Sequence, residues 1–81
     1  MFAKLYGPPD DQVLAIFTEG NDGPELRVYA NPGGILGVSE VAIAYHDDKR
    51  DEAQKVFEEL DEAGARKIVA PLYEAAAAFG A

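Results

Sequence analysis

The chain has 81 residues, enough for one domain spanning 1–81, with no cysteine and a formal net charge of -8 from 15 acidic and 7 basic residues. The missing cysteines exclude disulfides and thiolate-bound metals, and the acidic surface would repel phosphate backbones, so we expect no direct binding of nucleic acid. The N-terminus lacks the pattern of a secretory signal and no apolar run approaches the ~20 residues of a membrane span, so we expect a cytoplasmic protein without a membrane segment.

The first part of the chain predicts short antiparallel strands. Residues 2–6 form a strand that ends before Pro8, since proline cannot continue a hydrogen-bonded ladder. Residues 12–19 and 25–30 predict a hairpin, because the Gly-Asn-Asp-Gly-Pro segment at 20–24 consists of residues that favour turns.

A longer strand follows at about 35–46, with a bend or bulge at Gly37. The pattern then changes to helical spacing, and Asp47 or Asp48 can cap the helix by accepting a backbone N–H. We predict one main amphipathic helix at about 48–63. Its apolar stripe consists of Ala53, Val56, Phe57, Leu60 and Ala63.

The C-terminal segment permits two interpretations. Gly64 stands where a left-handed residue would end the main helix, and 67–70 reads as a short strand ended by Pro71. A short helix at 72–79 then follows, and Pro71 could also open that helix at its first position. The expected fold is α+β, with an antiparallel sheet of four to five strands and the main helix packed on one face.

Two of the predicted strands are apolar on both faces. In the strand at 12–19, one face carries Val13, Ala15 and Phe17, and the other carries Leu14, Ile16 and Thr18. In the strand at 35–46, one face carries Val41, Ile43 and Tyr45, and the other carries Ala42 and Ala44. A half-solvated antiparallel sheet alternates apolar with polar residues, so both faces need cover. One helix covers one face only, and the C-terminal segment, a partner subunit or an apolar ligand must cover the other. We predict a homodimer that buries sheet faces or edges between its chains.

The strand at 35–46 leads into the main helix, which closes in Glu-Ala-Gly-Ala at 62–65, and a short strand and Pro71 follow. This order, over residues 35–71, resembles the second half of the vicinal oxygen chelate superfamily, which includes glyoxalase and bleomycin-resistance proteins. The resemblance implies a module of the βαβββ type, two of which form a cupped sheet around a small-molecule or metal site.

The chain departs from this family in its expected site. Glu40 stands at about the position where family enzymes carry a metal-binding histidine, and the closing strands of the family are missing before Ala81. The resemblance therefore implies that one chain cannot close the cup, whereas two chains could.

Few residues suggest chemistry. His46 is the one histidine and could bind a metal or act as a base, but a lone histidine without a second ligand is more typical of an exposed loop. Glu40 on an apolar strand needs a salt bridge or solvent. We assign no catalytic residue, metal ligand or cofactor. The candidate ligand-binding residues are Tyr29, Glu40, Tyr45 and His46, and the candidate partner-binding residues are Glu58, Glu59, Asp61 and Glu62.

The sequence favours a non-catalytic acidic binding module over an enzyme. We predict a half-size glyoxalase-like domain that acts as a homodimer and can bind a small apolar ligand. The alternative is an acidic inhibitor or adaptor, of the type found in phage and mobile elements, that docks on a basic nucleic-acid-handling protein. High net charge also serves solubility alone. A metal-dependent lyase or dioxygenase built across a dimer has the least support, because the ligands are missing.

Overall fold

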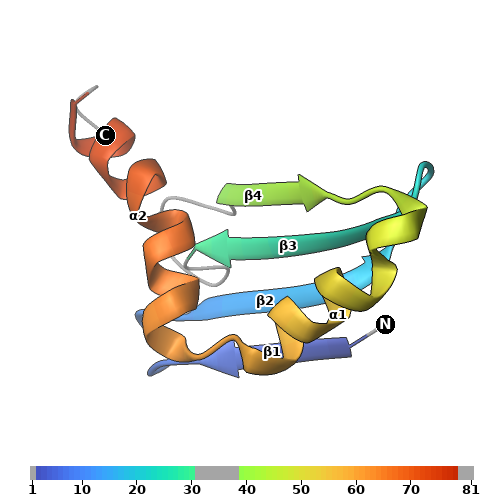
Figure 1. Ribbon diagram of the computed structural model, residues 1–81. Helices are drawn as coiled ribbons and strands as arrows, with labels where there is room; N and C mark the ends of the chain where they lie inside the picture. Colours follow the sequence, from blue (N-terminus) through green and yellow to red (C-terminus); the bar gives the residue numbers. More distant parts are fainter. Residues whose placement is uncertain (1, 31–38, 79–81) are drawn as a thin grey trace.

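The computed structural model describes residues 2–30 and 39–78 and has an α+β fold (Figure 1). Four antiparallel strands form one sheet in the order β1-β2-β3-β4. Both helices lie on the same face of this sheet (Figure 1). The elements are β1 (Phe2–Tyr6), β2 (Val13–Glu19), β3 (Pro24–Ala30), β4 (Ser39–Ala44), the 3-10 turn η1 (Asp47–Lys49), α1 (Arg50–Glu59) and α2 (Glu62–Ala78).

The predicted hairpin is confirmed as β2 and β3, which pair from Val13 opposite Ala30 to Glu19 opposite Pro24. The Gly20 amide donates to the Gly23 carbonyl at 2.7 Å, which closes the turn. Ser39–Ala44 confirms the second half of the strand predicted at about 35–46; the bend predicted at Gly37 lies outside the described residues.

The hydrophobic core lies between the sheet and the two helices. Every second residue of β2 and β3 is buried there, as a strand with one covered face requires. The rings of Phe17 in β2 and Phe57 in α1 lie 5.9 Å apart at a tilt of 41°, a favourable geometry for an aromatic pair. The buried hydrophobic residues are Val13, Ala15, Phe17, Leu26, Val28, Ala30, Ala53, Phe57, Ala65 and Val69.

The main helix is shorter than the predicted 48–63. It starts at Arg50 after η1, and the residue before it, Lys49, makes no side-chain capping bond, so the predicted cap by Asp47 or Asp48 is wrong. It ends at Glu59, because Leu60 turns to an extended conformation with ψ of 128°.

Gly64 is not the end of the main helix. It lies in the first turn of α2, where its amide donates to the Asp61 carboxylate at 2.8 Å. Asp61 therefore supplies the N-terminal capping bond of α2, as aspartate commonly does. The sequence pattern was ambiguous here because one helix can end and another begin within three residues.

The strand predicted at 67–70 is wrong, since α2 runs without interruption from Glu62 to Ala78 and contains Pro71. Ala65 and Val69 are separated by one helical turn, and both are fully buried against the sheet. We attribute the helix to this burial, which outweighs the backbone hydrogen bond that Pro71 cannot donate. The predicted helix at 72–79 is thus the second half of a longer one.

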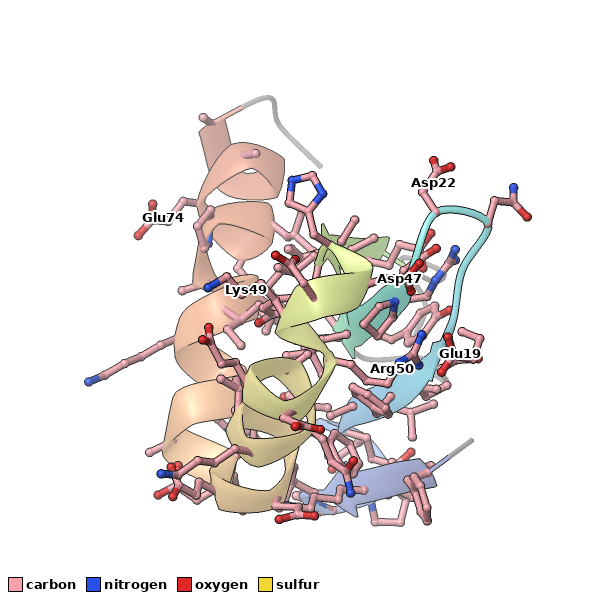
Figure 2. All side chains as sticks on the ribbon, turned by 45° about the vertical axis from the view of Figure 1, so that its right-hand side comes forward. Glu19, Asp22, Asp47, Lys49, Arg50 and Glu74 are labelled. Carbon is pink, nitrogen blue, oxygen red and sulfur yellow. The ribbon has the colours of Figure 1, made fainter. Side chains whose placement is uncertain are left out.

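An ion-pair group joins α1 to the far end of the hairpin. Arg50 lies between Glu19 of β2 and Asp47 of η1 (Figure 2), and its guanidinium donates to the Asp47 carboxylate at 2.9 Å and to that of Glu19. The hydrogen bond to Glu19 raises the pKa of Arg50 above its usual value, with a further contribution from Asp47. All three side chains are exposed, so we expect this group to orient α1 more than to stabilise the fold.

Candidate functional site

The candidate site is the sheet face that carries no helix, which we call the open face. The strand pairing fixes its residues, since positions of the same parity lie on one side. Among the described residues, α1 and α2 both pack on the opposite side (Figure 1). The open face consists of Ala3, Leu5, Leu14, Ile16, Thr18, Glu25, Arg27, Tyr29, Glu40, Ala42 and Ala44.

One half of the open face is apolar. Leu5 pairs with Leu14, which pairs in turn with Tyr29, and Ala3 pairs with Ile16 in the adjacent row. Leu5 is 58% exposed, and Leu14 and Ile16 are half-buried. Such cross-strand neighbours form a continuous surface, which we call the apolar strip: Ala3, Leu5, Leu14, Ile16 and Tyr29.

The other half of the open face contains a charged group in which the single cation, Arg27, is paired with two carboxylates. Arg27 forms ion pairs with Glu25 at 2.9 Å and with Glu40 at 3.5 Å, across strands β3 and β4. The Tyr29 hydroxyl and then the two carboxylates raise the pKa of Arg27 above its usual value. Glu40 thus has the salt bridge expected for a carboxylate on an apolar strand, and Arg27 offers no unpaired positive charge to a ligand.

The structure brings together two of the four predicted ligand-binding residues. Tyr29 and Glu40 are direct cross-strand partners on the open face. Tyr45 lies on the other side, where it packs against the core, and its amide donates to the Pro24 carbonyl at 3.0 Å. His46 is exposed in the turn before η1, beyond the end of β4, so it does not share a face with Glu40.

The four predicted partner-binding carboxylates lie at the junction of α1 and α2, and three of them have intramolecular contacts. Glu58 accepts from Gln54 at 3.1 Å, Asp61 caps α2, and Glu62 forms an ion pair with Arg66 at 3.0 Å. Glu59 is exposed.

Two residues of the architecture were missed from the sequence. The sequence did not match Arg27 with Glu40, because the two residues are 13 positions apart along the chain and only the strand register brings them together. Lys4 lies in the strand predicted at 2–6, and its ammonium donates to three carbonyl groups at the end of α1. No local signal could reveal the second contact, because it joins positions more than 50 residues apart.

Two further features bear on the site. In residues 2–30 and 39–78, no group of three or more histidine, aspartate or glutamate side chains could hold a metal ion. Within the same residues, neither helix combines the length and apolar character needed to cross a membrane.

Comparisons with known proteins give no relative: no protein-family model, curated protein or solved structure matches this chain. The resemblance to the vicinal oxygen chelate superfamily therefore stays a prediction from the sequence.

Proposed function

We propose that this protein is a non-catalytic binding module that acts as a homodimer and uses its open face to bind a small, neutral apolar ligand. One observation carries the proposal. Both helices cover the same face of the sheet, and the apolar strip on the other face is left without cover among the described residues.

The size of the apolar strip sets the strength of binding. A ligand that removes ~200 Å² of apolar surface from water gains about 5 kcal/mol at about 25 cal/mol per Å². A dissociation constant of ~1 μM needs about 8 kcal/mol, and association itself is costly. A single strip therefore supports only weak binding, no tighter than the submillimolar range.

The charges of the open face indicate which ligands would be accepted. Arg27 is neutralised by Glu25 and Glu40, and the chain as a whole carries a net charge of -8. Anionic compounds gain nothing from this surface and are repelled at long range. Tyr29 offers a ring for apolar contact and a hydroxyl for one hydrogen bond, which suits a neutral aromatic compound.

The test uses the neutral dye Nile red, whose fluorescence rises in apolar surroundings. Ile16→Lys places a charge in the middle of the apolar strip, and Thr18→Lys places the same charge on the same face of the same strand, outside the strip. We expect wild type and Thr18→Lys to bind the dye alike and Ile16→Lys to bind it at least tenfold more weakly. Equal binding by all three proteins would refute the open face as the binding surface.

The alternative function, docking of the acidic helix surface on a basic protein, has less support. Glu58, Asp61 and Glu62 already make intramolecular contacts, so that surface offers fewer free carboxylates than the sequence suggests. Such docking would weaken steeply with salt, whereas binding of a neutral ligand to the open face would not.

A further inference from the structure

We propose that two copies join through their β4 strands, antiparallel about a two-fold axis at Ala42, to form one eight-stranded sheet with the four helices on one face. This inference rests on the homodimer of the proposed function and adds which surface makes it. The arrangement leaves both open faces uncovered on the same side of the joined sheet, with one apolar strip toward each of its outer edges.

β4 is the better of the two sheet edges for such pairing. Among the described residues no strand pairs with its outer side. Natural edge strands are commonly protected by lysine, proline or a bulge, and Ser39–Ala44 contains no lysine and no proline. Its one charge, Glu40, is drawn toward Arg27 of its own sheet. The opposite edge, β1, contains Lys4 and is followed by Pro8 and Pro9.

One hydrogen bond shows which residues of β4 direct their backbone N–H and C=O groups toward β3 and which direct them outward. The Tyr45 amide donates to the Pro24 carbonyl, so Tyr45 points its backbone groups toward β3. Along an antiparallel strand, the N–H and C=O groups of successive residues point alternately toward one neighbouring strand and toward the other side. Glu40, Ala42 and Ala44 therefore point their N–H and C=O groups away from β3. These three residues supply the donors and acceptors for a second β4. Ala42 and Ala44 are exposed and small, which leaves room for the partner strand.

Charge and burial select the register. With Ala42 opposite its own copy, Glu40 faces Ala44 of the other chain and lies far from the second Glu40. A shift of the axis to Val41 makes the two Glu40 carboxylates diagonal neighbours, which like charges disfavour. The same register places Val41 opposite Ile43 on the helix side. Two apolar pairs thus form by symmetry, as a two-fold contact requires.

Helix α2 supplies a second, independent observation. Its 17 residues span about 25 Å, whereas the four strands span only about 14 Å from β1 to β4. The C-terminal half of α2 therefore extends beyond β4 (Figure 1), and Glu74 marks it in Figure 2. Exposure rises accordingly, from the fully buried Val69 to 40% at Tyr73.

The two-fold axis gives this projecting half a partner. α2 crosses the sheet near the Ser39 end of β4 (Figure 1), and antiparallel pairing brings the Ala44 end of the second β4 beneath it. Ile43 and Tyr45 lie there on the helix side and are only half-buried in a single chain. Leu72 and Tyr73 of one copy would pack over Ile43 and Tyr45 of the other, which completes both cores.

The test compares Ala42→Pro with Ala3→Pro by sedimentation velocity. Both are exposed alanines on the open face at an edge of the sheet, and the register gives both an amide that points outward, so neither proline breaks a bond within the chain. We expect Ala42→Pro to weaken the dimer at least tenfold and Ala3→Pro to leave it unchanged. Equal effects, or a dimer that survives Ala42→Pro, would overturn the inference.

Two cysteine variants test the same inference without introducing a proline, which can itself disrupt folding. Ala42→Cys and Ala3→Cys each give a chain with one cysteine, since the natural chain has none. A short bismaleimide should cross-link Ala42→Cys to a covalent dimer and leave Ala3→Cys monomeric; the reverse would contradict β4 pairing.

A dimer lost in Ile16→Lys but kept in Ala42→Pro would show that copies join by their open faces. A monomeric wild type that still binds Nile red would refute the dimer alone.

Discussion

Lys4 and Phe57 connect the edge strand β1 to the end of helix α1. The Lys4 ammonium donates to the Phe57 carbonyl at 2.6 Å and lies 4.8 Å from the centroid of the Phe57 ring. It also donates to the carbonyls of Glu58 at 2.9 Å and Leu60 at 3.2 Å. The last carbonyls of a helix lack hydrogen-bond donors within the helix and carry partial negative charge. A cation at this position supplies the donors and offsets the charge. One side chain thereby satisfies the end of the helix and connects it to the sheet.

Replacing Lys4 should therefore destabilise the fold. We expect Lys4→Met to lower the free energy of unfolding by about 1–3 kcal/mol, because the carbonyls at the end of α1 lose charged donors. Lys55→Met is the matched control, since it also replaces a lysine by methionine but at an exposed position of α1. It should cost less than about 0.5 kcal/mol. Urea unfolding followed by circular dichroism measures both. Equal costs would mean that the Lys4 contacts do not stabilise α1.

The hydroxyl of Tyr6 makes the stability of the fold depend on pH in the alkaline range. Its hydroxyl donates to the Leu60 carbonyl at 2.7 Å. Burial, and then the charges of Asp61 and Glu62, raise the pKa of Tyr6 above its usual value of 10.0. The unfolded chain thus releases this proton at lower pH than the folded one. The stabilisation is fully present below pH ~10 and is lost as the pH rises through the folded pKa.

Tyr6→Phe removes this contribution. We expect the variant to be less stable by about 1 kcal/mol at neutral pH, because one hydrogen bond is lost. We also expect its stability to fall less steeply than that of wild type above pH ~10. Urea unfolding at a series of pH values gives both quantities. A variant whose stability falls as steeply as that of wild type would argue against the raised pKa.

Two glycines should respond oppositely to alanine. Gly23 is buried with a φ of 145°, and a Cβ there would lie 2.5 Å from the Tyr45 carbonyl oxygen, so Gly23→Ala should cost about 1–3 kcal/mol. Gly64 lies in the first turn of α2, where a Cβ would meet Asp61 and Leu60 at 3.2 Å. In a helix, alanine is more stable than glycine by about 1 kcal/mol, so Gly64→Ala should be neutral or stabilising. Thermal unfolding separates them, and a loss of stability in Gly64→Ala would contradict this account.

The sheet could be predicted from local sequence, because its signals are local. The strand at 2–6 and the hairpin at 12–19 and 25–30 are bounded by glycine and proline, which restrict the backbone directly. The face assignment of Leu14 and Ile16 followed from alternation alone. The idea that the central strands need cover on both sides came from the same pattern.

The ends of the helices could not be predicted in this way. α1 ends where Lys4 and Tyr6 of β1 bind its last carbonyls, and this contact joins segments far apart in the sequence. The β-branched residues of 67–70 favoured a strand locally, and only burial of Val69 against the sheet selects the helix. Of the predicted ligand-binding residues, Tyr29 and Glu40 lie together on the open face, whereas the position of His46 depended on where β4 ends.

We propose that the sheet of a single chain is incomplete and that a second copy completes it. Light scattering coupled to size-exclusion chromatography, at low micromolar concentration, measures the molar mass directly. We expect twice the chain mass of 8.7 kDa. A single species at 8.7 kDa would contradict it.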